Sequence, residues 1–207
     1  MLKKLFSLIA LFGTFAFTAC FDIEQSYSIV NGNYVYNAVI GFNKSALVLA
    51  DMTTDDLREQ IMTGETYEEL QQKFDDISVT EDEKKSYISV TETLKDESPE
   101  KPEVTDEKIY LQFNNDSTSQ NILDVKQSMD TDPDYKAMAD LIFADSNWCI
   151  NISKTITETV SSAKLVDDNG NSIDVAFEEK ENCFTVSFPI LTIFNSEFQI
   201  KGVEIYR

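Results

Sequence analysis

The sequence predicts an α+β fold in which a mainly antiparallel, curved β-sheet carries two short helical pairs packed on one side. Three observations predict it. Apolar and polar residues alternate over many short segments, which is the period of a half-buried strand. Turn signals such as Asn31-Gly32 lie between such segments. Segments with helical spacing interrupt the strands twice, at residues 53–74 and 117–142. Strand groups that alternate with helices in this way are typical of α+β domains.

The first nineteen residues have the three parts of an export signal. Two lysines precede an apolar run over residues 5–17, and small residues follow it. This order is typical of a secretory signal. The apolar run is shorter than the ~20 residues that a membrane-spanning helix needs. We therefore assign residues 1–19 to a signal peptide and residues 20–207 to a single α+β domain.

The end of this signal resembles the lipobox of bacterial lipoproteins. Phe17, Thr18 and Ala19 stand where the lipobox stands, and Cys20 follows them. In such lipoproteins the cysteine thiol receives a diacylglycerol and becomes the new N-terminus. The resemblance implies that Cys20 is acylated and that the acyl chains hold the protein to a membrane on the exported side of a bacterial cell envelope. The alternative is that Cys20 is an ordinary half-cystine and that cleavage occurs elsewhere.

The mature chain begins directly with strand patterns. Apolar residues fall on odd positions over 21–29 and on even positions over 34–42, and Asn31-Gly32 between them predicts a hairpin. Because the first strand follows Cys20 at once, the chain has almost no tether. We expect the folded domain to sit against the membrane instead of reaching away from it.

Helix signals follow the hairpin. Thr53 or Thr54 is the expected N-cap of a helix that ends before Gly64, and Thr66 with Glu69 has the spacing of a capping box for the next helix. A second predicted helical pair begins near Ser117 and at Asp132-Pro133, where proline takes the first helical position. The two helical pairs are expected to lie between groups of strands.

Strand patterns fill most of the remaining chain. They cover residues 84–94, 109–113, 148–156, 163–166, 173–177, 184–188 and the last stretch up to 207. The apolar register of that last stretch shifts at Gly202, which suggests a bulge. Between the predicted strands at 84–94 and 109–113, residues 96–107 are charged and contain two prolines, which predicts a mobile charged loop.

Charge and composition exclude several kinds of function. Without residues 1–19 the chain keeps 15 basic and 37 acidic residues, a formal charge of −22. Such a surface repels phosphate backbones, so we expect no nucleic-acid partner. Histidine is absent, which excludes Ser-His-Asp and Cys-His catalysis and imidazole ligands for metals. No motif predicts a cofactor. Two carboxylates could still serve as acid and base, but no pair stands out among so many.

The two later cysteines, Cys149 and Cys183, each sit on the polar face of a predicted strand. If these strands are neighbours, the thiols can meet across the ladder, and an exported location permits oxidation. We predict a disulfide between them, which would stabilise the fold by ~3–4 kcal/mol in the chain-entropy model. The alternative is two free thiols. Two sulfurs alone do not predict a metal site.

One acidic stretch has the spacing of a calcium-binding loop. Asp167, Asn169, Asn171 and Glu178 fall at positions 1, 3, 5 and 12 of an EF-hand-like loop, which supplies oxygen ligands to calcium. Ser172 replaces the glycine of the sharp turn, and strands flank the stretch. A hairpin turn is therefore the favoured interpretation, and a weak calcium site is the alternative.

The order of elements and the segment from SSAK to DVAF, residues 161–177, resemble the LppM-type domain of bacterial envelope lipoproteins. This resemblance implies an envelope domain with lipid binding and no active site to transfer. The leading hypothesis is therefore a lipid-anchored, non-enzymatic protein that binds an apolar ligand or envelope lipid in a lined cavity. The alternatives are a protein-binding or scaffolding module with an unpaired sheet edge, such as the C-terminal strand, and a carboxylate-based hydrolase.

Overall fold

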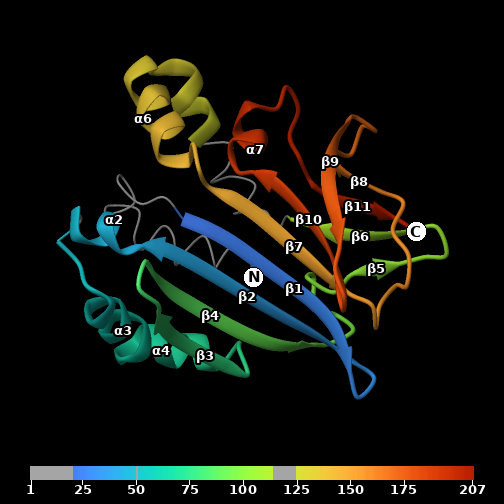
Figure 1. The fold of residues 1–207 in the computed structure, drawn as a ribbon, viewed down its shortest axis with the longest axis horizontal. Helices are drawn as coiled ribbons and strands as arrows, with labels where there is room; N and C mark the ends of the chain where they lie inside the picture. The colour runs from blue at the N-terminus through green and yellow to red at the C-terminus, as the bar shows by residue number, and fades with distance from the viewer. Residues whose placement is uncertain (1–20, 50, 114–124) are drawn as a thin grey trace.

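The computed structural model describes residues 21–49, 51–113 and 125–207 (Figure 1). Its strands are β1 (Phe21–Val30), β2 (Asn33–Asn43), β3 (Asp76–Glu81), β4 (Lys85–Leu94), β5 (Glu103–Val104), β6 (Lys108–Gln112), β7 (Asn147–Ser153), β8 (Ser162–Val166), β9 (Ser172–Glu179), β10 (Cys183–Pro189) and β11 (Gly202–Tyr206). Its helices are α2 (Lys44–Leu49), α3 (Thr54–Met62), α4 (Gly64–Gln71), α6 (Pro133–Phe143) and α7 (Leu191–Asn195), and residues 125–131 are helical as well.

The strands form one large, mostly antiparallel sheet of eleven strands in the order β3-β4-β2-β1-β7-β10-β9-β8-β11-β6-β5. Short helices accompany it, so the predicted class, α+β with a mainly antiparallel sheet, is confirmed. Figure 1 shows α3 and α4 beside β3 and β4 at one end of the sheet, and α6 beyond the start of β7. A single cluster of buried apolar residues joins the helices to the sheet.

The hairpin predicted at Asn31-Gly32 is present. β1 and β2 pair antiparallel from Phe21 opposite Phe42 to Val30 opposite Asn33. The two turn residues have φ values of 52° and 83°. Positive φ at both central positions is the requirement of a type I′ turn, which asparagine and glycine satisfy at low cost. The hairpin thus fixes the register that places the odd residues of β1 in the core.

A parallel contact links the two halves of the chain. β1 pairs parallel with β7, with Ile23 opposite Trp148 and Tyr27 opposite Ile152, whereas every other strand pair is antiparallel among the described residues. The alternation pattern of the two segments did not predict that they would pair. Periodicity reports which face of a strand is buried and carries no information about its neighbour.

β9 connects two parts of the sheet. Its first half pairs with β8, where Val175 lies opposite Ala163, and its second half pairs with β10, where Phe177 lies opposite Val186. β9 therefore links the strands β1, β7 and β10 to the strands β8, β11 and β6. β11 is paired on both sides, so the expectation of a free edge at the C-terminal strand is wrong, and the edges are β3 and β5.

In the first helical segment, one predicted helix start is confirmed and the other is wrong. Thr53 caps α3, because its side chain accepts a hydrogen bond from the Asp56 backbone and the Asp56 side chain accepts one from the Thr53 backbone. α4 begins at Gly64 with Thr63 as N-cap, so the helix start expected at Thr66 is wrong. α2, β3, β5 and α7 have no counterpart in the sequence-based prediction. α2, β5 and α7 have too few residues to show a period, whereas β3 alternates at Ile77 and Val79 and its pattern was missed.

Residues 96–107, predicted as a mobile loop, contain the two-residue strand β5. The Lys101 ammonium lies 2.6 Å from the Asp96 carboxylate and 5.3 Å from the centre of the Tyr34 ring. The Ser98 hydroxyl accepts a hydrogen bond of 2.9 Å from the Lys95 backbone. The contact with Tyr34 places Lys101 against the β1–β2 hairpin, and the mobility of the loop stays a prediction.

We predict that Gly202→Ala lowers the free energy of unfolding by about 2 kcal/mol or more, at the upper part of the range for overpacking. A Cβ at this position would lie 2.4 Å from the Leu111 carbonyl oxygen, which belongs to the paired backbone of β6. Gly41→Ala is the matched control, because its Cβ would meet the movable Tyr87 ring at 3.0 Å. Urea unfolding of both variants measures the difference, and equal losses would contradict the argument.

Candidate functional site

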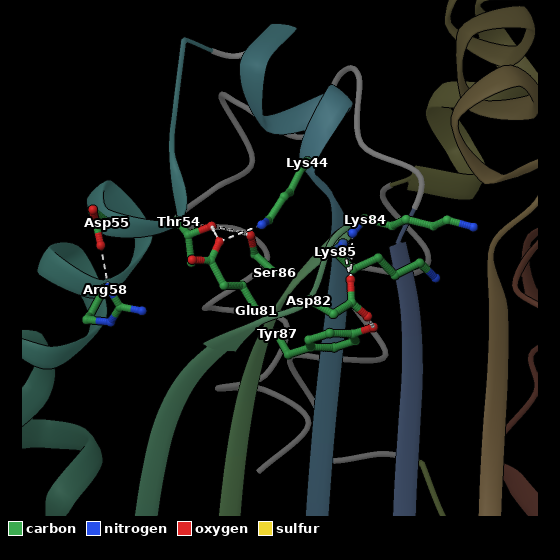
Figure 2. Close-up of polar contacts among 10 residues, drawn as sticks. All are labelled: Lys44, Thr54, Asp55, Arg58, Glu81, Asp82, Lys84, Lys85, Ser86 and Tyr87. Atoms are coloured by element: carbon green, nitrogen blue, oxygen red, sulfur yellow. Dashed lines mark hydrogen bonds and ion pairs between the residues drawn. The ribbon is translucent and has the colours of Figure 1, made fainter.

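A cluster of polar side chains ties together four elements at one end of the sheet. Lys44 is the first residue of α2, Thr54 begins α3, Glu81 ends β3 and Ser86 lies in β4. We call these four residues the Lys44–Ser86 cluster. Thr54 and Ser86 are buried, at 8% and 0% exposure. Figure 2 shows the four side chains converging from their separate elements.

The Glu81 carboxylate is the centre of this cluster. It lies 2.6 Å from the Lys44 ammonium and accepts a hydrogen bond of 2.8 Å from the Thr54 hydroxyl. The Thr54 and Ser86 hydroxyls are 2.6 Å apart. The hydrogen bonds from Lys44 and Thr54 hold the pKa of Glu81 below its ordinary value, so the carboxylate is charged at neutral pH.

This arrangement holds structure together and does not present a reactive group. Ser86 is fully buried, and its hydroxyl contacts another hydroxyl instead of a base. The Lys44 ammonium is held against the Glu81 carboxylate by an ion pair. A nucleophile needs both access to substrate and a neighbouring base. Ser86 has neither, and the Thr54 hydroxyl is held between Ser86 and Glu81.

The turn between β3 and β4 is fixed by a second carboxylate. Asp82 accepts hydrogen bonds from the Tyr87 hydroxyl at 2.6 Å and from the Lys84 and Lys85 backbones at 2.7 Å each. These three donors, with Tyr87 the strongest, lower the pKa of Asp82 to about 2. The Lys84 side chain points away from these acids in Figure 2. It forms no ion pair with the part of the chain that the structure describes.

A hollow of about 230 Å³ lies beside the Lys44–Ser86 cluster and is open to solvent. Its apolar wall consists of Leu47, Val48 and Met52, and its polar wall includes Lys44 and Glu81. Leu47 and Met52 are buried, whereas Val48 is 69% exposed. The hollow therefore places an exposed apolar side chain next to a charged pair.

A second, larger hollow lies between the end of α4, the end of β4 and the loop after it. It has a volume of about 510 Å³, within the range of ligand pockets. Its lining is mainly polar: Gln71, Gln72, Lys73, Phe74, Asp75, Glu92, Thr93, Lys95, Glu97, Ser98, Pro99 and Glu100. An apolar ligand would meet few apolar side chains there. Of its carboxylates, Asp75 accepts a hydrogen bond from the Thr93 backbone, which gives it a structural role.

One polar side chain is buried in the core itself. Gln25 is 1% exposed, accepts a hydrogen bond of 3.0 Å from the Trp148 indole and donates one of 2.8 Å to the Tyr36 hydroxyl. Burial raises the pKa of Tyr36, so the phenol is neutral. The Phe113 ring stacks on Trp148 with ring centres 4.8 Å apart. The sequence signal for this network is a glutamine at an odd, core-facing position of β1.

The predicted disulfide between Cys149 and Cys183 is wrong, because both thiols are free. The strands that carry them, β7 and β10, are neighbours as expected. The register, however, pairs Cys149 with Ser187 and Cys183 with Ser153. The two cysteines are thus four residues apart along the ladder, roughly 13 Å, beyond the reach of a disulfide. Burial raises the pKa of Cys149, which keeps it in the thiol form.

The stretch with calcium-loop spacing is a hairpin turn between β8 and β9, as the favoured interpretation had it. Asp167 accepts hydrogen bonds from the backbones of Asn169 and Asn171 and from both of their side chains. Glu178 lies near the far end of β9, opposite Thr185. The weak calcium site is therefore wrong, since its ligands do not converge. Nowhere in the described ranges do three carboxylate or thiol groups gather to hold a metal ion.

The predicted lipidation residue, Cys20, and the signal before it lie outside the described residues. The first described residue, Phe21, is 6% exposed and paired with Phe42. Along the described segments, no helix has the length and apolar character needed to cross a membrane. No family model, no curated protein and no solved structure matches this chain.

We predict that Thr54→Val lowers the free energy of unfolding by about 1–3 kcal/mol, because the buried Ser86 hydroxyl loses its partner and Glu81 loses a donor. Thr80→Val is the matched control, since Thr80 is exposed on β3. Chemical denaturation of the two variants gives both values. A Thr54 variant as stable as the control would refute the structural role of the Lys44–Ser86 cluster.

We predict that Tyr87→Phe raises the pKa of Asp82 from about 2 toward its ordinary value, because the variant removes the largest cause of the shift. The pKa of Asp82 is lower in the folded protein than in the unfolded chain, where it is ~3.9. The charged carboxylate therefore stabilises the fold above pH ~3.9, and this stabilisation is lost as the pH falls toward 2. NMR titration of the carboxyl carbons measures the shift. Tyr206→Phe, which removes a hydrogen bond to Glu204, should leave the Asp82 titration unchanged.

Proposed function

We propose that this chain is a lipid-anchored protein of the bacterial cell envelope, non-enzymatic, that binds an envelope lipid or another apolar ligand. One observation carries the proposal: Phe21, the residue after the proposed acylated Cys20, is buried and already paired in β1. The Phe21 backbone donates a hydrogen bond of 3.3 Å to the buried Ser146 hydroxyl, and its ring packs against Phe143 with centres 5.7 Å apart. An anchor at Cys20 would therefore hold the domain directly on the membrane.

The ligand side of the proposal is supported by the smaller hollow, where Leu47, Val48 and Met52 offer an apolar wall near the proposed anchor. Mixed apolar and charged lining suits an amphipathic molecule such as a lipid. The resemblance to LppM-type envelope domains agrees with a lipid ligand. The proposal includes a curved sheet with the helical pairs packed on one side of it.

A scaffolding role is the second candidate, and one observation favours it. β9 keeps Ile173 and Val175 only half-buried and leaves Phe177 37% exposed on the same face of the strand. Apolar side chains in a row on an accessible strand can contact a partner protein. Phe177→Asp should then reduce recovery of a partner from detergent-solubilised envelopes, whereas the lipid-binding proposal expects no change.

The anchoring proposal is tested by the mass of the protein made in a host that acylates lipoproteins. We predict a mature chain that begins at Cys20 and carries the added mass of its acyl groups. Cys20→Ala should retain residues 1–19, because removal of a lipoprotein signal depends on the modified cysteine. An unmodified thiol at position 20 in the parent protein would refute the anchor. Native mass spectrometry of the same gently extracted sample reports any bound lipid.

A further inference from the structure

The point at which the chain enters the fold defines one end of the molecule. Phe21 lies opposite Phe42, and β2 ends one residue later at Asn43. α2 begins at Lys44, whose backbone donates a hydrogen bond of 2.9 Å to the Lys84 carbonyl oxygen. Asn43 also lies opposite Lys85, the first residue of β4. The start of β1, α2 and the β3–β4 turn therefore occupy the same end of the sheet (Figure 1).

The chain between the proposed anchor and this end has no slack. Consecutive Cα atoms are about 3.8 Å apart, so Cys20 must lie within a side chain's length of Phe21. Phe21 itself cannot swing away, because its ring lies among buried residues and its strand is paired on both sides. Acyl chains on Cys20 would thus enter the bilayer next to this end of the domain.

The surface at this end differs in charge from the rest of the chain. α2 and residues 82–85 carry three lysines and two acids, and the paired acids Glu81 and Asp22 bring the formal charge of this end to −1. The whole chain has a formal charge of −20. Two of these lysines also neutralise acids of neighbouring strands, because Lys44 pairs with Glu81 and Lys85 pairs with Asp22. This end therefore repels anionic head groups less than the remaining surface does.

The same surface carries an exposed apolar side chain. Val48 in α2 is 69% exposed, the highest value among the large apolar residues that are both described and exposed. Its neighbours Leu47 and Met52 line the hollow of about 230 Å³ beside it. An apolar side chain next to lysines is the composition of surfaces that rest in the interface between lipid head groups and acyl chains.

We propose that α2 and residues 82–85 form the face of the domain that rests on the bilayer, with Val48 inserted among the head groups. The occupant of this surface is the lipid of the anchoring membrane, because the lipid-bearing residue adjoins it. This inference rests on the proposed lipid anchor and adds the orientation of the domain. It places the start of α2 in the interface and the β1–β2 turn away from the anchor.

The test replaces Val48 with a photoreactive phenylalanine analogue in the full-length, acylated protein. Val30 is the matched control, because it is 50% exposed and lies at the other end of β1, about 30 Å from Phe21. Both proteins are reconstituted in vesicles of phosphatidylethanolamine and phosphatidylglycerol and irradiated. Mass spectrometry then measures protein–lipid adducts at each position. Thermal unfolding of both proteins checks that the replacements leave the fold unchanged.

We expect several-fold more lipid adduct at position 48 than at position 30. Equal adducts, or more at position 30, in a protein whose Cys20 carries acyl groups would overturn the orientation and leave the anchor standing. The mass of the same sample reports the state of Cys20. An unacylated Cys20 would overturn both the proposed function and this inference, so the two failures are distinguishable.

Discussion

The parallel contact between β1 and β7 is the interaction on which the rest of the sheet depends. It alone joins β3, β4, β2 and β1 to the C-terminal strands within the described sheet. Gln25 reinforces it from inside, because this side chain bonds to Tyr36 on β2 and to Trp148 on β7. The two bonded residues Gln25 and Trp148 are 123 positions apart, so the contact forms only after a long loop closes. The pairing of β1 with β7 therefore requires the C-terminal half of the chain to be present.

The buried amide of Gln25 also explains why β1 pairs with β7 and not with another apolar strand. Ile23 and Tyr27 on either side of Gln25 could pack against many apolar strands, since hydrophobic contact has no direction. A buried amide is costly unless its donors and acceptors are satisfied. The Trp148 indole supplies a donor at one position of one strand. A shift of β7 by one residue would move this indole to the other face of the sheet.

Sequence analysis predicted the elements that local chemistry determines. The turn at Asn31-Gly32 and the cap at Thr53 follow from the conformations that these residue types favour, and both are present. The neighbours of strands that no short turn joins were out of reach. Cys149 and Cys183 were each placed on the polar face of a strand, and whether they meet depends on the register across the whole ladder, which separates them. The Lys44–Ser86 cluster was missed for the same reason, since its members come together only through tertiary contacts.

A domain anchored through the first residue before a central strand meets its partners under a geometric constraint. Lipoproteins with flexible leaders can search a volume that grows with the length of the leader. Here Phe21 is buried and β1 is paired on both sides, so an anchor at Cys20 leaves the domain only rotation and lateral diffusion. A ligand must then come from the membrane itself or approach within the height of the domain. The hollow beside Val48 lies at the end where β1 begins, whereas the exposed Phe177 lies on β9, three strands away in the sheet order, so the two surfaces would serve different partners.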